Sequence, residues 1–214
     1  MNRSLFSIVV CCFNEEKTII HNIKSILKIE YPKHLYELII IDDGSTDQTL
    51  NKIKEWIKKN NIDINLKLFK INHSGLSIAR NTGFYLSKND YCLFCDADGS
   101  VDRNILKAYD ERIKNNINYI YTGKVNNFNK SNKISNFIFN FHNEPSLFLA
   151  KNKLIGANML LNKKMIKDEA PFFNFFTARG DETAMFMNLQ KKYNIDKAIY
   201  VENAIVNNET ADNF

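Results

Sequence analysis

Two runs of apolar, β-favouring residues in this sequence end abruptly in carboxylates. The first run ends at Asp42 and Asp43, a later run ends at Asp96 and Asp98, and small turn-forming residues follow both. Continuous apolar runs are typical of buried parallel strands, and ligands bind beyond the carboxyl ends of such strands. Unpaired acids in that place repel one another and lose solvation, so they do not serve stability. The pattern predicts a site for a metal ion or a polar ligand.

Asp96 and Asp98 have a spacing that suits a metal ion. Side chains two residues apart in extended backbone point the same way, so both carboxylates can face one cation. A hard divalent cation such as Mg²⁺ or Mn²⁺ binds through one or two carboxylates together with substrate phosphates. The alternative is that Asp98 and Gly99 simply form a turn. Asp42 and Asp43 have the same alternative, but an acid there could also accept hydrogen bonds from a base or a ribose.

The elements that carry these residues alternate between strand and helix in the first half of the chain. Apolar runs followed by helical periodicity predict a parallel sheet with helices on both faces. Asn14 is expected to cap the first helix, with Glu15 and Glu16 in its first turn, and Ser45 or Thr46 to cap the second. Strands are predicted at residues 5–12, 36–41, 66–71 and 91–95, and the next two helices at 75–86 and 101–113.

The second half of the chain has a less regular pattern. One domain over residues 1–214 is expected, since this length can bury one sizeable core. A nucleotide-binding half, about residues 1–115, would precede an acceptor-binding half, about residues 116–214. The elements predicted in the second half are strands at 118–125, 155–161 and 198–201, a helix at 181–193, and an ambiguous aromatic segment at 131–141.

Composition and charge exclude several classes of protein. The chain is 44% hydrophobic and 25% charged, which is typical of a soluble globular protein. Its net charge of +5 is spread along the chain without an aromatic-rich basic cluster, which argues against nucleic-acid binding. A mild positive field would suit an anionic substrate or an acidic membrane surface. No run reaches the ~20 apolar residues of a membrane span, and no signal peptide is recognisable. The cytoplasm is the expected compartment, with the inner face of the membrane as a place of peripheral association.

The four cysteines are expected to be reduced there. Cys92 and Cys95 have the spacing of a zinc motif, but they fall on opposite faces of a predicted strand. We therefore interpret them as core residues.

Four ordered motifs, at family-like spacing, resemble those of glycosyltransferase family 2. The resemblance covers essentially the whole chain. It implies an α/β GT-A (Rossmann-like) fold, with a mostly parallel sheet flanked by helices and a less regular C-terminal acceptor-binding half. It also implies inverting sugar transfer by one direct displacement. The matching segments are residues 7–16, 37–47, 75–83 and 91–98, with looser matches at 156–158 and 179–182.

The resemblance also implies roles for individual residues. Asp98, supported by Asp96, would hold Mn²⁺ or Mg²⁺ between the two phosphates of the donor, where the cation stabilises the charge of the leaving diphosphate. Cys11 would lie against the base, Asp43 would contact the base, and Arg80 would lie close to the nucleotide. The full set implied to bind the nucleotide sugar is Cys11, Asn14, Glu15, Asp42, Asp43, Arg80 and Asp96.

The acceptor hydroxyl needs a general base. Members of this family usually take it from the second acid of a Glu-Asp pair that opens a late helix, and here the order is reversed, as Asp181-Glu182. Glu182 occupies the position of the base, a one-residue slip would give the role to Asp181, and Asp168 or Glu169 is a further alternative. The pair could also serve only to cap the helix.

Two departures from the family pattern affect the expected function. Many members have a late histidine near the metal, whereas the last histidine here is His142, so Asn207 or water would complete the coordination. Processive members carry a late Gln-x-x-Arg-Trp motif, and the single tryptophan here is the early Trp56. One sugar per acceptor is therefore expected. His73 could touch substrate, and His142 with the phenylalanines at 137–141 could shape an acceptor pocket, although loop and core positions are the simpler interpretation.

The sequence thus predicts a metal-dependent, non-processive glycosyltransferase. Its donor would be a nucleotide-diphosphate sugar, most simply a UDP-sugar, and its acceptor a saccharide or a lipid-linked saccharide. One alternative is a degenerate member that binds a nucleotide or a partner protein without turnover. The other is nucleotidyl transfer to a sugar phosphate, against which the acidic, glycine-free loop at 13–16 argues.

Overall fold

The computed structural model describes residues 3–115, 117–127, 154–166 and 181–208. Within these ranges, the strands form one sheet of eight in the order β3-β2-β1-β4-β7-β6-β8-β5. Neighbours among β3, β2, β1 and β4 are parallel, β7 is antiparallel to both β4 and β6, β6 and β8 are parallel, and β5 is antiparallel to β8. The strands are β1 (Phe6–Cys12), β2 (Tyr36–Asp42), β3 (Asn65–Lys70), β4 (Tyr91–Asp96), β5 (Gly99–Val101), β6 (Ile120–Asn127), β7 (Asn158–Asn162) and β8 (Ile199–Asn208).

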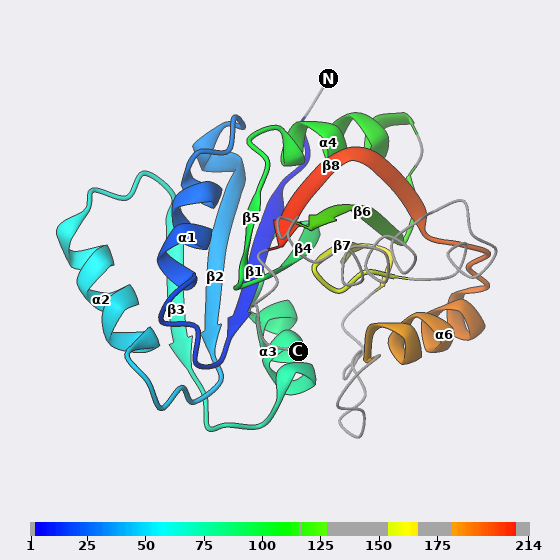
Figure 1. Cartoon of the computed structure of the whole chain (residues 1–214). Coiled ribbons are helices and arrows are strands. Elements are labelled where there is room, and N and C mark those ends of the chain that lie inside the picture. The colour runs from blue at the N-terminus through cyan, green and yellow to red at the C-terminus, as the bar shows by residue number, and fades with distance from the viewer. Residues whose placement is uncertain (1–2, 116, 128–153, 167–180, 209–214) are drawn as a thin grey trace.

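Helices cover both faces of this sheet, as predicted (Figure 1). One core contains apolar residues of α1, α2 and α4, and the other contains those of α3 and α6. Cys95 lies in the first core and Cys92 in the second, which confirms that the two cysteines face opposite sides of β4. The helices are α1 (Ile19–Leu27), α2 (Thr49–Lys59), α3 (Leu76–Leu86), α4 (Ile105–Asn115) and α6 (Asp181–Tyr193), with a short 3₁₀ turn at Lys33–Leu35.

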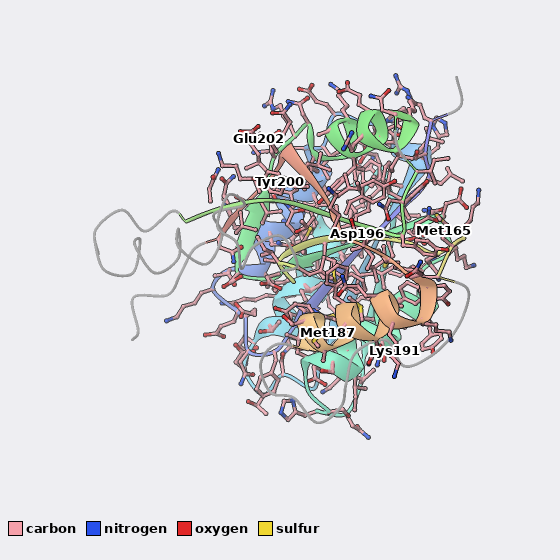
Figure 2. The ribbon with its side chains drawn as sticks, turned by 90° about the vertical axis from the view of Figure 1, so that its right-hand side faces the viewer. Met165, Met187, Lys191, Asp196, Tyr200 and Glu202 are labelled. Carbon is pink, nitrogen blue, oxygen red and sulfur yellow. The ribbon has the colours of Figure 1, made fainter. Side chains whose placement is uncertain are left out.

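Helix α6 has the bounds predicted from the sequence, residues 181–193. Its buried side chains include Met185, Phe186 and Leu189, which pack into the second core. Met187, labelled in Figure 2 on the outward side of the helix, is 64% exposed. None of the described helices is long and apolar enough to cross a membrane.

The predicted caps of the first two helices are wrong. Helix α1 begins at Ile19, so neither Asn14 nor the acids at 15 and 16 lie in its first turn. Helix α2 begins at Thr49, whose N–H donates to Asp47 Oδ1 over 2.9 Å rather than to either residue predicted to cap it. Asn14 has a φ of +58°, a left-handed conformation that asparagine tolerates in turns.

The predicted helix at 101–113 is wrong at its start. Val101 belongs to β5, which pairs with β8, and α4 begins at Ile105. The last strand is also longer than predicted, because β8 pairs with both β6 and β5 over residues 199–208. The ambiguous segment 131–141 lies outside the described residues.

Candidate functional site

The carboxyl ends of β1, β2 and β4 lie side by side. Cys12 of β1 pairs with Asp42 of β2, and Cys11 pairs with Asp96 of β4. This register brings the two predicted acidic motifs to one edge of the sheet. The edge is open beside β4, where the Asp96 side chain is 36% exposed.

Helix α1 holds the turn that follows β4. Asn22 is fully buried, and its Nδ2 donates to the carbonyl oxygens of Asp96 and Gly99, each over 2.9 Å. A Cβ on Gly99 would lie 2.7 Å from Asn208 Oδ1 and 2.8 Å from the Asn207 carbonyl oxygen, so only glycine lets β8 approach this closely. The turn carrying the Asp-x-Asp pair is therefore fixed from two sides.

Asp43 is built into the turn that precedes α3. Its Oδ1 accepts the N–H of Ser74 over 2.8 Å, and its Oδ2 accepts the N–H of Gly75 over 2.9 Å. His73 Nδ1 lies 2.9 Å from the same Oδ2 and 3.0 Å from the Asp43 carbonyl oxygen. Gly44, with a φ of +73°, allows this contact, because a Cβ there would lie 2.7 Å from the His73 nitrogen.

Phe13 is a member of this site that sequence analysis missed. It follows β1, is 40% exposed, and stacks on His73 with ring centroids 4.1 Å apart and an interplanar angle of 21°. The signal was an aromatic residue directly after a buried strand, at the edge where ligands bind. The pair of rings beside Asp43 offers a flat surface on which a base can stack.

Asp42 differs from Asp43 in its surroundings. Its side chain is fully buried, and within the described parts of the chain neither carboxylate oxygen has a hydrogen-bond partner. Asp42 follows the alternation of Leu38 and Ile40 and so faces the core under α1 and α2. Its contact with a nucleotide stays a prediction.

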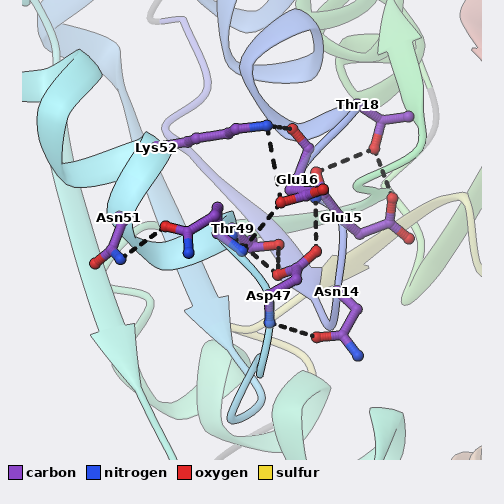
Figure 3. Close-up of polar contacts among 9 residues, drawn as sticks. Asn14, Glu15, Glu16, Thr18, Asp47, Thr49, Asn51 and Lys52 are labelled. Carbon is purple, nitrogen blue, oxygen red and sulfur yellow. Dashed lines mark hydrogen bonds and ion pairs between the residues drawn. The ribbon is translucent and has the colours of Figure 1, made fainter.

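The turn after β1 is tied to the turn after β2 (Figure 3). Asn14 Oδ1 accepts the backbone N–H groups of Thr46 and Asp47 over 2.9 and 3.3 Å. Glu15 Oε2 accepts the Thr18 hydroxyl over 2.5 Å. Burial raises the pKa of Glu15, and the carboxylates of Asp96 and Asp47 act in the same direction, so Glu15 belongs electrostatically to the acidic edge.

Arg80 joins the two predicted catalytic regions. It lies on α3 and is 4% exposed. Its Nη2 is 3.3 Å from Asp96 Oδ1, and its Nη1 is 3.6 Å from Glu182 Oε2 in the first turn of α6. The structure thus brings Glu182 to the acidic edge; the side chain of Asp181 lies outside the described part, as do Asp168 and Glu169.

Cys11 lies at the same edge, next to the guanidinium of Arg80. Burial raises the pKa of its thiol, the positive charge of Arg80 opposes that rise, and Asp96 adds to it. The thiol therefore stays neutral, which suits a packing role against a flat ligand and not a nucleophilic one.

A sequence profile described as Glycosyl transferase family 2 matches residues 7–169 of this chain, which is more than half of its length. The chain belongs to glycosyltransferase family 2. The family predicted from the sequence is therefore confirmed.

Named relatives agree with this membership. Over 97% of its length the chain is 29% identical to the poly(ribitol-phosphate) beta-N-acetylglucosaminyltransferase TarP of Staphylococcus aureus (strain N315), and the match covers 64% of TarP. A match to TarS of S. aureus (strain Mu50) is 30% identical and covers 48% of this chain and 18% of TarS. The chain thus spans less than two thirds of the length of these relatives.

Solved structures show the fold. The crystal structure of S. aureus TarS 1-349 in complex with UDP-GlcNAc has a TM-score of 0.77 at 20% identity, over 98% of this chain and 60% of that one. The mannosyltransferase PcManGT from Pyrobaculum calidifontis, in complex with GDP-Man and Mn²⁺, has a TM-score of 0.73 at 17% identity, over 99% and 59%. The predicted GT-A fold, with its mostly parallel sheet, is confirmed.

The acidic edge of this family 2 chain suits a hard divalent cation. Asp96 and Asp98 offer carboxylate oxygens, and no group of three or more His, Cys, Asp or Glu residues that could hold a metal occurs among the described residues. Two carboxylates leave coordination positions for phosphate oxygens and water, which is how Mg²⁺ is commonly bound. Asn207, predicted as a possible further ligand, has its Oδ1 engaged by Asn126 Nδ2 over 3.1 Å.

Proposed function

We propose that this chain carries the catalytic domain of an inverting glycosyltransferase that moves one sugar from a nucleotide-diphosphate donor to a saccharide or lipid-linked saccharide. The observation that carries the proposal is the meeting of Asp96, Arg80 and Glu182 within one family 2 site. A leaving diphosphate needs stabilisation of its charge, and an acceptor hydroxyl needs a base. The site offers groups for both tasks within the reach of one arginine.

Residues of the first half would bind the donor. The Phe13–His73 ring pair would stack on the base, and the Asp43 carboxylate would accept a hydrogen bond from its edge. Asp98 and Asp96 would hold Mn²⁺ or Mg²⁺, which when bound stabilises the negative charge of the departing diphosphate. These roles are supported by the position of all five side chains at the carboxyl edge of β1, β2 and β4.

Glu182 would take the proton of the acceptor hydroxyl. It stands at the first turn of α6 with a side chain that is 22% exposed, so an acceptor can reach it. The adjacent guanidinium favours the ionised carboxylate, which is the form a base needs. Attack by the hydroxyl on the face opposite the diphosphate would invert the anomeric centre in one displacement.

The names of the relatives narrow the donor and acceptor to be tested first. TarP and TarS are named as poly(ribitol-phosphate) beta-N-acetylglucosaminyltransferases, which favours a UDP-sugar and a phosphate-linked acceptor. The net charge of +5 is compatible with such an anionic acceptor. A cytoplasmic location, with peripheral association at the inner face of the membrane, stays a prediction; cosedimentation with anionic lipid vesicles would test the association.

Release of UDP or GDP from a panel of nucleotide sugars tests the proposal. The chain is incubated with each donor, Mn²⁺, and either poly(ribitol phosphate) or a lipid-linked saccharide. Acceptor-dependent release of a nucleoside diphosphate supports sugar transfer. Release of pyrophosphate from a nucleoside triphosphate and a sugar phosphate would instead show nucleotidyl transfer. Tight nucleotide binding without any release would show a degenerate binding module.

A further inference from the structure

The guanidinium of Arg80 is shared between two carboxylates that are distant in the sequence. Asp96 ends β4 in the first half of the chain, and Glu182 opens α6 in the second. Nη2 faces Asp96 over 3.3 Å and Nη1 faces Glu182 over 3.6 Å. Arginine keeps its charge at every physiological pH, and its planar fork can direct separate nitrogens at separate partners. One positive charge therefore serves two acids.

Packing holds the guanidinium in this place. A Cβ on Gly156 would lie 2.5 Å from Arg80 Nη2 and 3.0 Å from both Cζ and Nη1, so the group lies flat against the Gly156 backbone. Helix α3 is itself seated closely on the sheet, because a Cβ on Gly83 would lie 2.3 Å from Val9 Cγ1. The arginine stem cannot withdraw without displacing α3 or the segment at Gly156.

The shared charge makes the two acids competitors. A guanidinium between two carboxylates interacts with each less favourably in free energy than it would if the other were absent, since the three groups must share one arrangement. A cation that binds Asp96 neutralises that carboxylate and repels Arg80. The guanidinium then gains by moving closer to Glu182, which lies on its other side.

We propose that Arg80 is a positioning residue that couples occupancy of the metal–diphosphate site at Asp96 to the placement of Glu182. This inference rests on the proposed function, because it requires a ligand at Asp96. Donor binding would draw Glu182 onto Arg80 and so set the base before the acceptor reacts. Linkage makes the coupling reciprocal: neutralising Glu182 leaves Arg80 wholly to Asp96 and weakens binding of the metal–nucleotide complex.

A double-mutant cycle on binding tests the coupling without any turnover. The affinity for UDP, and separately for GDP, is measured by titration calorimetry with saturating Mn²⁺ in four proteins: the unaltered chain, Glu182→Gln, Arg80→Lys and the double variant. Lysine keeps the charge, but its single ammonium cannot direct separate donors at both carboxylates. Glu182→Gln should weaken binding about fivefold in the unaltered background, at the lower end of typical coupling, and less than about twofold in the Arg80→Lys background.

A matched control and a second variant keep the result interpretable. Glu202→Gln removes an exposed acid on β8 and should leave nucleotide affinity unchanged. Gly156→Ala keeps Arg80 and both acids but pushes on the guanidinium, and it should abolish the Glu182 effect as Arg80→Lys does. If Arg80→Lys fails to fold, as judged by circular dichroism, the same cycle is run with Gly156→Ala.

The outcomes separate this inference from the proposed function. An equal effect of Glu182→Gln in both backgrounds would show that Glu182 acts directly on the metal, and it would overturn the coupling. No effect of Glu182→Gln in the unaltered chain would overturn it as well. Failure of the unaltered chain to bind either nucleotide with Mn²⁺ would overturn the proposed function itself. For a positioning role, Arg80→Lys should also lower kcat more than it raises KM for the acceptor.

Discussion

Asn22 on α1 donates a hydrogen bond from its Nδ2 to the carbonyl oxygen of Asp96 over 2.9 Å. The same nitrogen donates to Gly99 over 2.9 Å, so one buried side chain holds both ends of the turn that carries Asp96 and Asp98. The metal-binding pair is therefore positioned by a helix near the start of the chain. Its placement does not depend on β4 alone.

Replacing Asn22 with alanine should lower both stability and ligand binding. Two buried carbonyls would lose their donor, at a cost of about 2 kcal/mol in the free energy of unfolding. The freed turn should also weaken the rise in melting temperature that UDP and Mn²⁺ produce together. Urea unfolding and thermal shift measure the two effects, and Asn51→Ala, at an exposed position on α2, is the control. A normal ligand-induced shift in Asn22→Ala would show that the turn keeps its shape without this residue.

Asp98→Asn should abolish turnover while leaving the fold intact. The change preserves the shape of the side chain and removes the charge that would hold the cation. Loss of one electrostatic stabiliser of a transition state costs on the order of 100-fold or more in kcat. Sugar transfer at saturating donor is the measurement, with Asp90→Asn, at the other end of β4, as the matched control. Near-normal transfer by Asp98→Asn would refute the metal role of this residue.

Glu182→Gln should lower kcat far more than it lowers donor affinity. A missing general base costs on the order of 100-fold or more in rate, whereas coupling through Arg80 would change nucleotide affinity only about fivefold. Transfer rates and calorimetric affinities of the same preparations give the two numbers. Asp181→Asn is measured beside it. If Asp181→Asn loses the rate and Glu182→Gln keeps it, the base lies one residue earlier in the helix.

The sheet and its acidic edge could be predicted from the sequence because they depend on local pattern. The apolar runs that form β1, β2 and β4 are buried on both faces and end at carboxylates within one residue of the predicted bounds. Neighbouring parallel strands then bring Asp43 and Asp96 to the same edge without further information. Helix α6 was equally legible, since its apolar spacing is regular from residue 181 to residue 193.

Features set by distant pairings could not be predicted. Val101 reads as the start of a helix, but it forms β5 because β8 pairs with it across the chain. Asn14 reads as a helix cap, but its side chain instead binds the backbone of the turn after β2. The double contact of Arg80 depends on α6 folding back over α3, and no local spacing encodes that.

Acid stability should depend on Glu37, which lies on β2 at the end opposite the site. Its side chain is 4% exposed and accepts hydrogen bonds from Ser7 Oγ at 2.6 Å, Lys67 Nζ at 2.5 Å and the Lys88 N–H at 2.8 Å. Burial opposes ionisation of Glu37, but these three donors outweigh it and hold the pKa of the carboxyl below its ordinary value. The ionised Glu37 is thus favoured in the folded chain.

A depressed pKa contributes stability that is fully present above the unfolded value of about 4.3 and is lost as pH falls through the folded value. The free energy of unfolding should therefore decline below about pH 4.3, and Glu37→Gln should make that decline shallower while lowering stability at neutral pH. Urea titrations from pH 7 to pH 3 measure both. Glu55→Gln, whose side chain is 70% exposed on α2, should leave the slope unchanged. An unaltered acid slope in Glu37→Gln would assign the acid sensitivity to other buried carboxylates, such as Asp110, which also has a lowered pKa because the hydrogen bonds it accepts outweigh its burial.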